Sequence, residues 1–411
     1  MVDQRRIDDQ RLVDAVAAAR HLGIAVRSLY AYVSRGQIRS VAGASGRPRL
    51  YAFADLERLR VRRDARAGHG AVAAGALRWG EPVLDSAITA ITPNGPAYRG
   101  RLAVELAAAG TPFESVAELL WSGYLPVAPA WPRVAFPFSG IARLLARDAH
   151  PLDVMSLLVP VAHLHDRVGR DDRVDTVLEH GRHLIPLLAA ATAPGFAAAA
   201  ATRSLGARSV AAIATRALGI AAADAPLLDA ALVLLADHEL NASSFAARVA
   251  ASTDADPYAC VAAALATASG SKHGTASEDV SRFAEHVGEP SRARAAVRAL
   301  RRNGLVPPGF GHPLYPDGDP RAGPLLEAAG RRDPRRTRTL FAIVDATTDA
   351  HPNVDFGLAA LVAAIGAPSE AASGLFAVAR SAGWLAHAVE QRAAGFMLRP
   401  RARYTGVAVT P

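Results

Sequence analysis

Residues 309–321 read Gly309-Phe310-Gly311-His312-Pro313-Leu314-Tyr315-Pro316-Asp317-Gly318-Asp319-Pro320-Arg321. The glycines and prolines of this stretch predict a loop, because both residue types favour turns and end regular elements. The loop also carries ionisable side chains, and it is flanked by segments with helical periodicity. Polar groups on a loop between helices are typical of a functional site, although a lone histidine beside glycine is more often structural.

Three further segments place ionisable residues among apolar helical stretches in the same way. They are Leu235-Ala236-Asp237-His238-Glu239-Leu240-Asn241-Ala242-Ser243, Gly270-Ser271-Lys272-His273-Gly274-Thr275-Ala276 and His351-Pro352-Asn353-Val354-Asp355-Phe356. Helical periodicity dominates the chain from about residue 77 onward, so we expect these segments to be turns and helix starts. Each segment alone is a weak indication of function.

Composition narrows the class of protein. A length of 411 residues suggests two or three domains, and a hydrophobic content of 51% is enough for a sizeable core. The single cysteine, Cys260, excludes an internal disulfide framework and favours a reducing cytoplasm. The mixed-charge start argues against a signal peptide. The alanine-rich runs are too short and too weakly apolar for membrane spans, so we expect no membrane association.

The positive charge is concentrated near the N-terminus. Residues 1–70 hold 14 arginines and 7 acidic residues, a net charge of +7 out of +8 for the whole chain. Such an asymmetry predicts a basic module that meets an anionic partner. A general preference for arginine over lysine is the alternative explanation, since Lys272 is the only lysine.

In their order and spacing, the four segments resemble the citrate synthase family. The likeness extends to Ala97-Tyr98-Arg99-Gly100, Leu119-Leu120-Trp121-Ser122-Gly123-Tyr124-Leu125-Pro126 and the ending around residues 379–387 and 398–406. It covers residues 77–411 and implies an all-α fold. The resemblance implies a large domain, about 77–268 and 374–411, and a small domain, about 269–373, with the active site in the cleft between them.

The resemblance implies an acyltransferase that condenses acetyl-CoA, or another short acyl-CoA, with oxaloacetate. Citrate or an alkylcitrate and CoA are formed through an enol intermediate. A thioester methyl is a weak carbon acid, so a carboxylate base needs a hydrogen-bond donor on the thioester oxygen. By resemblance Asp355 is the base, His273 is that donor, and His312 polarises the ketone of the oxo-acid.

The carboxylates of the oxo-acid require paired donors, which guanidinium groups provide. The resemblance assigns this role to Arg321 and Arg380, with Arg399 supplied across the interface of a homodimer. It adds His238 as a further oxo-acid contact. We expect no metal and no cofactor apart from coenzyme A as the acyl carrier.

Two departures from the family pattern concern the CoA side of the site. Lys272 stands where the family commonly has leucine. It could contact a CoA phosphate or an acidic substrate, depress the proton affinity of His273, or simply face solvent. Pro313 and Pro316 replace residues that are commonly basic and expected to help bind CoA, so the preferred acyl-CoA stays open.

Residues 1–64 resemble a MerR/excisionase-type winged helix-turn-helix, followed by a glycine- and alanine-rich linker at 65–76. In such modules the second helix enters the major groove and basic residues meet phosphates. The residues expected to contact DNA are Arg27, Arg35, Arg39, Arg47 and Arg49. A protein-interaction module of the same shape is the competing interpretation.

Two other functions stay open: a DNA-binding regulator that senses CoA esters or oxo-acids, and a citryl-CoA lyase. Four histidines have no metal-like partners in the sequence and are expected on solvated helix faces: His163, His165, His180 and His183. We expect His387 to be a core or interface histidine.

Overall fold

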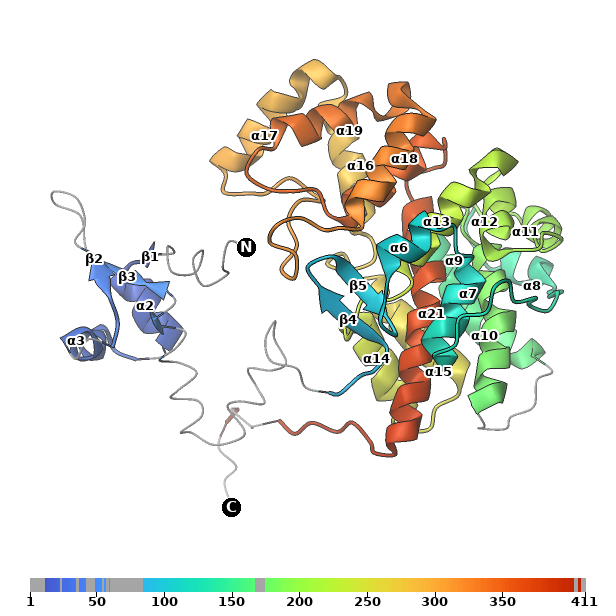
Figure 1. The fold of residues 1–411 in the computed structure, drawn as a ribbon, viewed down its shortest axis with the longest axis horizontal. Coiled ribbons are helices and arrows are strands. Elements are labelled where there is room, and N and C mark those ends of the chain that lie inside the picture. The colour runs from blue at the N-terminus through green and yellow to red at the C-terminus, as the bar shows by residue number, and fades with distance from the viewer. Residues whose placement is uncertain are drawn as a thin grey trace. The chain divides into compact units, whose positions relative to one another are not determined.

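The computed structural model describes residues 12–22, 24–34, 37–41, 49–53, 55–56, 59, 84–166, 174–402 and 406–407. The chain divides into two compact units, Met1–Asp85 and Ser86–Pro411, and each is described by itself (Figure 1). Arg35, Arg47 and the expected linker at 65–76 lie outside the described residues.

The N-terminal unit combines two helices with a small sheet. Its elements are β1 (Leu12–Val13), α2 (Ala15–Leu22), α3 (Val26–Ser34), β2 (Ser40–Val41) and β3 (Leu50–Ala52). The antiparallel sheet has the order β1-β3-β2. Asp14 caps α2 by accepting a hydrogen bond from the Ala17 amide at 2.8 Å. The buried core residues are Ala18, Leu22, Leu29, Ile38, Tyr51 and Leu56.

The larger unit begins with a sheet that the all-α expectation did not include. Strands β4 (Thr89–Thr92), β5 (Gly95–Tyr98) and β6 (Arg101–Leu102) form an antiparallel sheet in the order β4-β5-β6. The Tyr98 ring is fully buried, and its hydroxyl lies within 3.1–3.3 Å of the carbonyls of Val233, Leu234 and Asp237. The sheet is thereby tied to the turn that carries His238.

The rest of the unit is mostly helical, as expected. The helices between this sheet and residue 268 are α6 (Ala103–Ala108), α7 (Phe113–Ser122), α8 (Phe138–Ala142), α9 (Pro151–His165), α10 (Val174–Ala189), α11 (Ala198–Ser204), α12 (Val210–Leu218), η1 (Ala222–Asp224), α13 (Ala225–Leu235), α14 (Ala242–Ala251) and α15 (Pro257–Ala268). Six of them pack against the long C-terminal helix α21 (Ala371–Ala394).

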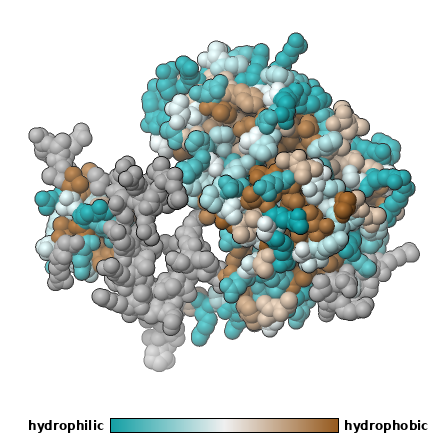
Figure 2. All heavy atoms as spheres, in the orientation of Figure 1, coloured by the Kyte–Doolittle hydropathy of each residue, from teal (hydrophilic) through white to brown (hydrophobic). Residues whose placement is uncertain are grey.

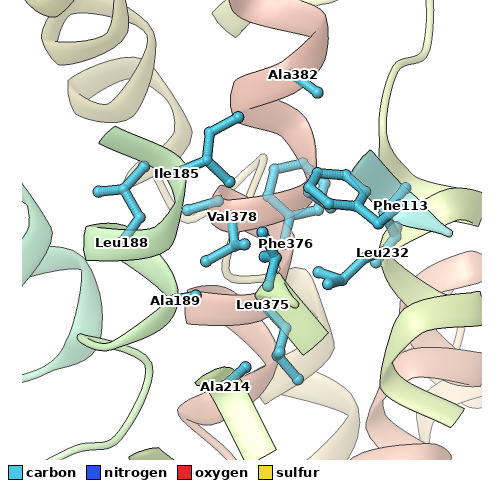
Figure 3. Packing of buried hydrophobic residues seen from close by; sticks show 14 of the residues in the cluster. Phe113, Ile185, Leu188, Ala189, Ala214, Leu232, Leu375, Phe376, Val378 and Ala382 are labelled. Atoms are coloured by element: carbon cyan, nitrogen blue, oxygen red, sulfur yellow. The ribbon is translucent and has the colours of Figure 1, made fainter. Parts of the chain in front are cut away.

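Helix α21 is the centre of the larger core. It is buried along nearly its whole length, and it contacts α7, α9, α10, α13, α14 and α15. Figure 3 shows Leu375, Val378 and Ala382 of α21 near Ile185 and Leu188 of α10 in this core. A helix with apolar residues on every side must be buried on every side, and this position makes α21 a fixed support for Arg380.

A second, smaller core lies between the helices of the segment expected to form the small domain. These are α16 (Ala276–Val287), η2 (Pro290–Arg292), α17 (Ala293–Arg302), α18 (Ala322–Arg332), α19 (Pro334–Ala346) and α20 (Val354–Ala364). Val280, Phe310, Ile343 and Phe356 are among its buried residues. Hydrophilic residues cover much of the outer face of this part of the molecule in Figure 2.

Helix α20 belongs to both cores. Phe356 and Ala360 pack in the smaller core, whereas Leu358 and Leu361 pack in the larger one. The first turn of α20 carries Asp355, so the expected base stands where the two cores meet. Among the described residues, no helix is long and apolar enough to cross a membrane.

Candidate active site

The loop at 309–321 is fastened to the start of α20 by backbone hydrogen bonds. The Asn353 amide donates to the Gly309 carbonyl at 2.8 Å, and the Gly311 amide donates to the His351 carbonyl at 2.8 Å. Gly309 has a φ of 77°, and a side chain there would collide with Val280 and Phe356. The loop that carries His312 is therefore held in register with the helix that carries Asp355.

His312 is a neutral hydrogen-bond donor. The Leu314 amide donates to Nδ1 of His312 at 3.1 Å, so Nδ1 is unprotonated. Burial and the positive charge of Arg321 lower the pKa of His312 to about 4. A neutral imidazole with an unprotonated Nδ1 carries its proton on Nε2, which gives His312 the donor that polarisation of a ketone requires.

His238 lies beside His312, in the turn between α13 and α14. Its ring centroid is 5.2 Å from that of His312, and its Nε2 is 3.0 Å from the hydroxyl of Tyr315. Burial, reinforced by the charges of Arg321 and Arg380, lowers the pKa of His238 well below its usual value. His238 is therefore a second neutral imidazole at the same place.

Two buried guanidinium groups lie close to these rings. Arg321 donates from Nε and Nη2 to the carboxylate of Asp319 at 2.9 and 2.8 Å. Arg380 donates from Nε to the Leu235 carbonyl at 2.9 Å, and its guanidinium lies over the ring of Phe376. Burial lowers the pKa of Arg380 to about 10, so it remains a cation at neutral pH.

Asp319 contacts more than Arg321. Its Oδ2 also accepts a hydrogen bond from the Val354 amide at 3.0 Å, at the first residue of α20. The Asp319 side chain has no exposed surface. One buried carboxylate thus joins a guanidinium expected to bind the oxo-acid to the helix start that carries Asp355.

His273 lies in the α15–α16 turn and is partly buried. Its Nε2 is 2.8 Å from the hydroxyl oxygen of Ser243, which also accepts a hydrogen bond from the indole of Trp384 at 3.0 Å. Burial first, and then the charge of Arg380, lowers the pKa of His273 to about 4. Burial and Arg380 account for this lowering of the His273 pKa, and Lys272 is not among its causes.

Asp355 has the properties of a base. Burial raises the pKa of its carboxyl above the usual value, while Arg321 and a hydrogen bond from Ser277 to Oδ1 at 3.1 Å oppose that rise. A raised pKa makes the carboxylate a stronger proton acceptor. Asn353 holds the residue in place by accepting hydrogen bonds from the amides of Asp355 and Phe356.

The remaining expected site residues lie on the surface. Arg399 is exposed on the segment after α21, and Lys272, Pro313 and Pro316 are exposed as well. Neither Arg399 nor Lys272 has a hydrogen bond or an ion pair within the described part of the chain. The fold therefore brings together His238, His273, His312, Arg321, Asp355 and Arg380, while Arg399 and Lys272 stand apart in solvent.

In the N-terminal unit, Arg27 and Arg49 are exposed. Arg39 is exposed too, but its guanidinium is bound to the carboxylate of Asp55 at 3.0 Å. In the larger unit, His387 is fully buried and lies 3.4 Å from the carboxylate of Asp237, in agreement with a core role.

Of the four other histidines, His180 is buried, which corrects the expectation of a solvated face. Its Nδ1 pairs with Asp166 at 2.7 Å. Within the described ranges, no group of histidine, cysteine and acidic side chains is arranged to hold a metal ion.

Sequence reasoning missed three residues of this cluster: Ser243, Tyr315 and Asp319. All three belong to the segments quoted above, yet nothing in their local pattern marks them as partners of a histidine or an arginine. Ser243 contacts His273, 30 residues away, and Tyr315 contacts His238, 77 residues away.

This fold and site define a mostly helical acid–base enzyme, in which neutral imidazoles, a carboxylate base and buried guanidinium groups converge. The family model for the citrate synthase C-terminal domain matches residues 76–401. Because that match covers most of the chain, the protein belongs to the citrate synthase family.

Similar proteins agree in sequence and in fold. Citrate synthase 2 of Bacillus subtilis is 39% identical over 184 residues, which span 43% of this chain and 50% of that protein. 2-methylcitrate synthase 2 of Corynebacterium glutamicum is 29% identical over 355 residues, 78% of this chain and 92% of that protein. Citrate synthase of Thermoplasma acidophilum, solved with carboxymethyl coenzyme A and oxaloacetate, is 24% identical at a TM-score of 0.70, covering 80% of this chain and 95% of that one.

Proposed function

We propose that this protein condenses a short acyl-CoA with oxaloacetate to give citrate or an alkylcitrate and free CoA. The observation that carries the proposal is the cluster itself: a carboxylate with a raised pKa, Asp355, shares a site with the neutral donors His273 and His312. Relatives that make citrate and relatives that make 2-methylcitrate both match the chain.

The first step forms a carbon nucleophile. Asp355 removes a proton from the carbon next to the thioester carbonyl, and His273 donates a hydrogen bond to the thioester oxygen. The electron pair of the broken C–H bond moves into the enol, whose oxygen is stabilised by the donor. Neutral His273 suits this role, because it stabilises developing charge without first needing a proton from solvent.

The second step forms the carbon–carbon bond. The enol attacks the ketone carbon of the oxo-acid, and His312 donates from Nε2 to the ketone oxygen, which becomes the hydroxyl of the product. Arg321, Arg380 and His238 bind the carboxylates, with Arg399 of a neighbouring subunit completing the set. Water then hydrolyses the thioester and releases CoA.

Two features of this proposal rest on residues at the surface. Lys272 is placed to meet a CoA phosphate, because it is an exposed cation next to His273. The exposure of Arg399 suits a residue that serves a second copy of the chain, so we propose a homodimer. Sedimentation of the purified protein tests the dimer. The single cysteine favours a cytoplasmic enzyme.

Product analysis tests the reaction. The purified protein, oxaloacetate and either acetyl-CoA or propionyl-CoA should give citrate or 2-methylcitrate by mass spectrometry. The ratio of the two products reports the preferred acyl chain. Formation of neither product from a folded, dimeric sample would contradict the proposed reaction.

A second function is proposed for the N-terminal unit, namely DNA binding through a winged helix-turn-helix. It is supported by two short helices packed on a three-stranded sheet, by the net charge of residues 1–70 and by the exposed Arg27 and Arg49. Phosphate contacts make affinity fall as salt rises. Salt-dependent binding to the protein's own promoter, retained in Asp355→Ala, tests this function apart from catalysis.

A further inference from the structure

Tyr315 stands between the residues that bind the oxo-acid in the proposed function. Its hydroxyl lies 3.0 Å from Nε2 of His238, and its ring centroid lies 4.9 Å from that of His312. The guanidinium carbon of Arg321 is 5.6 Å from the same ring. Tyr315 thus contacts three groups that face one small molecule.

The position of Tyr315 is well fixed. The side chain is buried, with 3% of the residue exposed. Its amide donates to the His312 carbonyl at 3.0 Å, and its carbonyl accepts from the Gly318 amide at 3.1 Å. A tyrosine held at both backbone groups and packed against two imidazoles presents its hydroxyl at a defined point.

Packing alone does not account for the hydroxyl. A phenylalanine would fill the same space against His238 and His312. Burial raises the pKa of Tyr315 to about 12, so the phenol stays protonated at neutral pH. In the described part of the chain, the hydroxyl has one hydrogen-bond partner, His238. A phenol has one donor and two acceptor sites, so that bond leaves capacity unused.

His238 and Tyr315 together carry one proton more than their mutual hydrogen bond needs. Neutral His238 has one N–H and Tyr315 has one O–H, and their mutual hydrogen bond uses one of these two protons. The keto and carboxylate oxygens of an oxo-acid are all acceptors. When Nε2–H of His238 donates to the tyrosine oxygen, the O–H of Tyr315 is free to donate to such an oxygen.

We propose that the hydroxyl of Tyr315 is a direct hydrogen-bond donor to the oxo-acid, supported by His238 behind it. This inference rests on the proposed function, because it takes the cluster around Arg321 and His312 as the oxo-acid site. It adds to that site a specificity-determining residue that recognises the acceptor oxygens of an oxo-acid.

The Tyr315→Phe variant tests the proposal, because it removes one oxygen and keeps the ring. Binding of oxaloacetate is measured by isothermal titration calorimetry without acyl-CoA. The dissociation constant should rise about ten-fold, as expected when a donor to a charged ligand is lost. The KM for oxaloacetate should rise in parallel, and the KM for acyl-CoA should stay within two-fold of the wild-type value.

Tyr258→Phe is the matched control. Tyr258 is as deeply buried as Tyr315, and its hydroxyl donates to Asp166. Its removal should leave oxaloacetate affinity unchanged. A change of less than two-fold in Tyr315→Phe would overturn the proposal, and so would an equal loss in both variants.

A second comparison separates direct contact from an effect through His238. In the His238→Gln background, Tyr315→Phe should still weaken binding by several-fold. If His238→Gln and the double variant bind oxaloacetate with equal affinity, Tyr315 acts only through His238, which contradicts direct donation. Wild-type protein that binds oxaloacetate yet releases no CoA would refute the proposed reaction alone. Full turnover with unchanged oxaloacetate affinity in Tyr315→Phe would refute this inference alone.

Discussion

The hydroxyl oxygen of Ser243 lies 2.8 Å from Nε2 of His273. The indole N–H of Trp384 already donates to this oxygen, and Oδ1 of Asn241 lies 2.8 Å from it. The single proton of Ser243 can therefore go to Asn241 or to His273. Only in the second arrangement does His273 carry its proton on Nδ1, where it can serve as the donor to a thioester oxygen.

Ser243→Ala should therefore lower kcat by roughly 10- to 100-fold, a part of what a positioned proton donor contributes. The KM for oxaloacetate should change little, because Ser243 supports the donor to the thioester. Ser244→Ala is the control, since that neighbouring hydroxyl is buried and has no hydrogen-bond partner among the described residues. Steady-state kinetics of the two variants checks this, and equal kcat values would contradict the assigned role.

Asp319→Asn should affect two parts of the site at once. The carboxylate holds Arg321 through two side-chain hydrogen bonds and also accepts from the Val354 amide. Breaking a buried ion pair costs about 3–5 kcal/mol, so the melting temperature should fall. The KM for oxaloacetate should rise by at least about ten-fold.

The control for Asp319→Asn is Asp333→Asn, which removes a carboxylate that caps α19 by accepting from the amides of Arg335 and Arg336. Because asparagine is as good an N-cap as aspartate, this variant should change stability little and leave the KM for oxaloacetate unchanged. A normal KM in Asp319→Asn would show that Arg321 does not need this carboxylate to bind the oxo-acid.

The double variant Pro313→Arg/Pro316→Lys should bind acyl-CoA more tightly. Both prolines are exposed on the loop that carries His312, so new cations there could meet the CoA phosphates without disturbing the core. We expect the KM for acyl-CoA to fall by several-fold at low salt and less at high salt, because salt screens exposed charges. Lys272→Leu should change it in the opposite direction. If neither variant changes the KM for acyl-CoA, then CoA does not bind near these residues.

Asp229→Asn should make stability less dependent on pH. Burial, with the charge of Glu114 nearby, raises the pKa of Asp229 to about 7 in the folded protein, against 3.8 in its ordinary state. The group therefore contributes full stability below about pH 4, and this contribution is lost as pH rises through about 7. The variant should melt higher than wild type at pH 8, by roughly 2 °C, and show no gain at pH 4.

Thermal melts at the two pH values check this expectation. Asp148→Asn removes an exposed carboxylate and should melt like wild type at both. A gain of equal size at pH 4 and pH 8 would contradict the titration of Asp229 as its cause.

The sequence could indicate most of this cluster because its residues lie in short contiguous motifs that resemble those of a known family. His238, Arg321 and Arg380 are buried, and the ring of His238 lies 5.2 Å from that of the partly buried His312. Ser243, Tyr315 and Asp319 could not be identified in this way. The contacts of Ser243 with His273, of Tyr315 with His238 and of Asp319 with Val354 span long sequence separations, although Asp319 also pairs with Arg321 two residues away. A serine or a tyrosine in a turn has no local feature that identifies its partner.

The sheet formed by β4, β5 and β6 was missed for a different reason. The stretch Thr92-Pro93-Asn94-Gly95-Pro96 predicts a loop, and proline is disfavoured inside a central strand because it has no N–H to donate. Strand β5 nevertheless pairs on both sides and includes Gly95 and Pro96. Burial of Ile88 and Tyr98 in the larger core outweighs the weak local preference.

Release of free CoA thiol tests the central claim most directly. Wild-type protein is mixed with oxaloacetate and acetyl-CoA, propionyl-CoA or butyryl-CoA, and the thiol is followed over time beside Asp355→Ala. The account predicts release with at least one acyl-CoA, dependent on oxaloacetate, and a rate at least about 100-fold lower in the variant, because a general base contributes that much or more. No release from any of the three by folded wild-type protein, or equal rates with and without the Asp355 carboxylate, would contradict it.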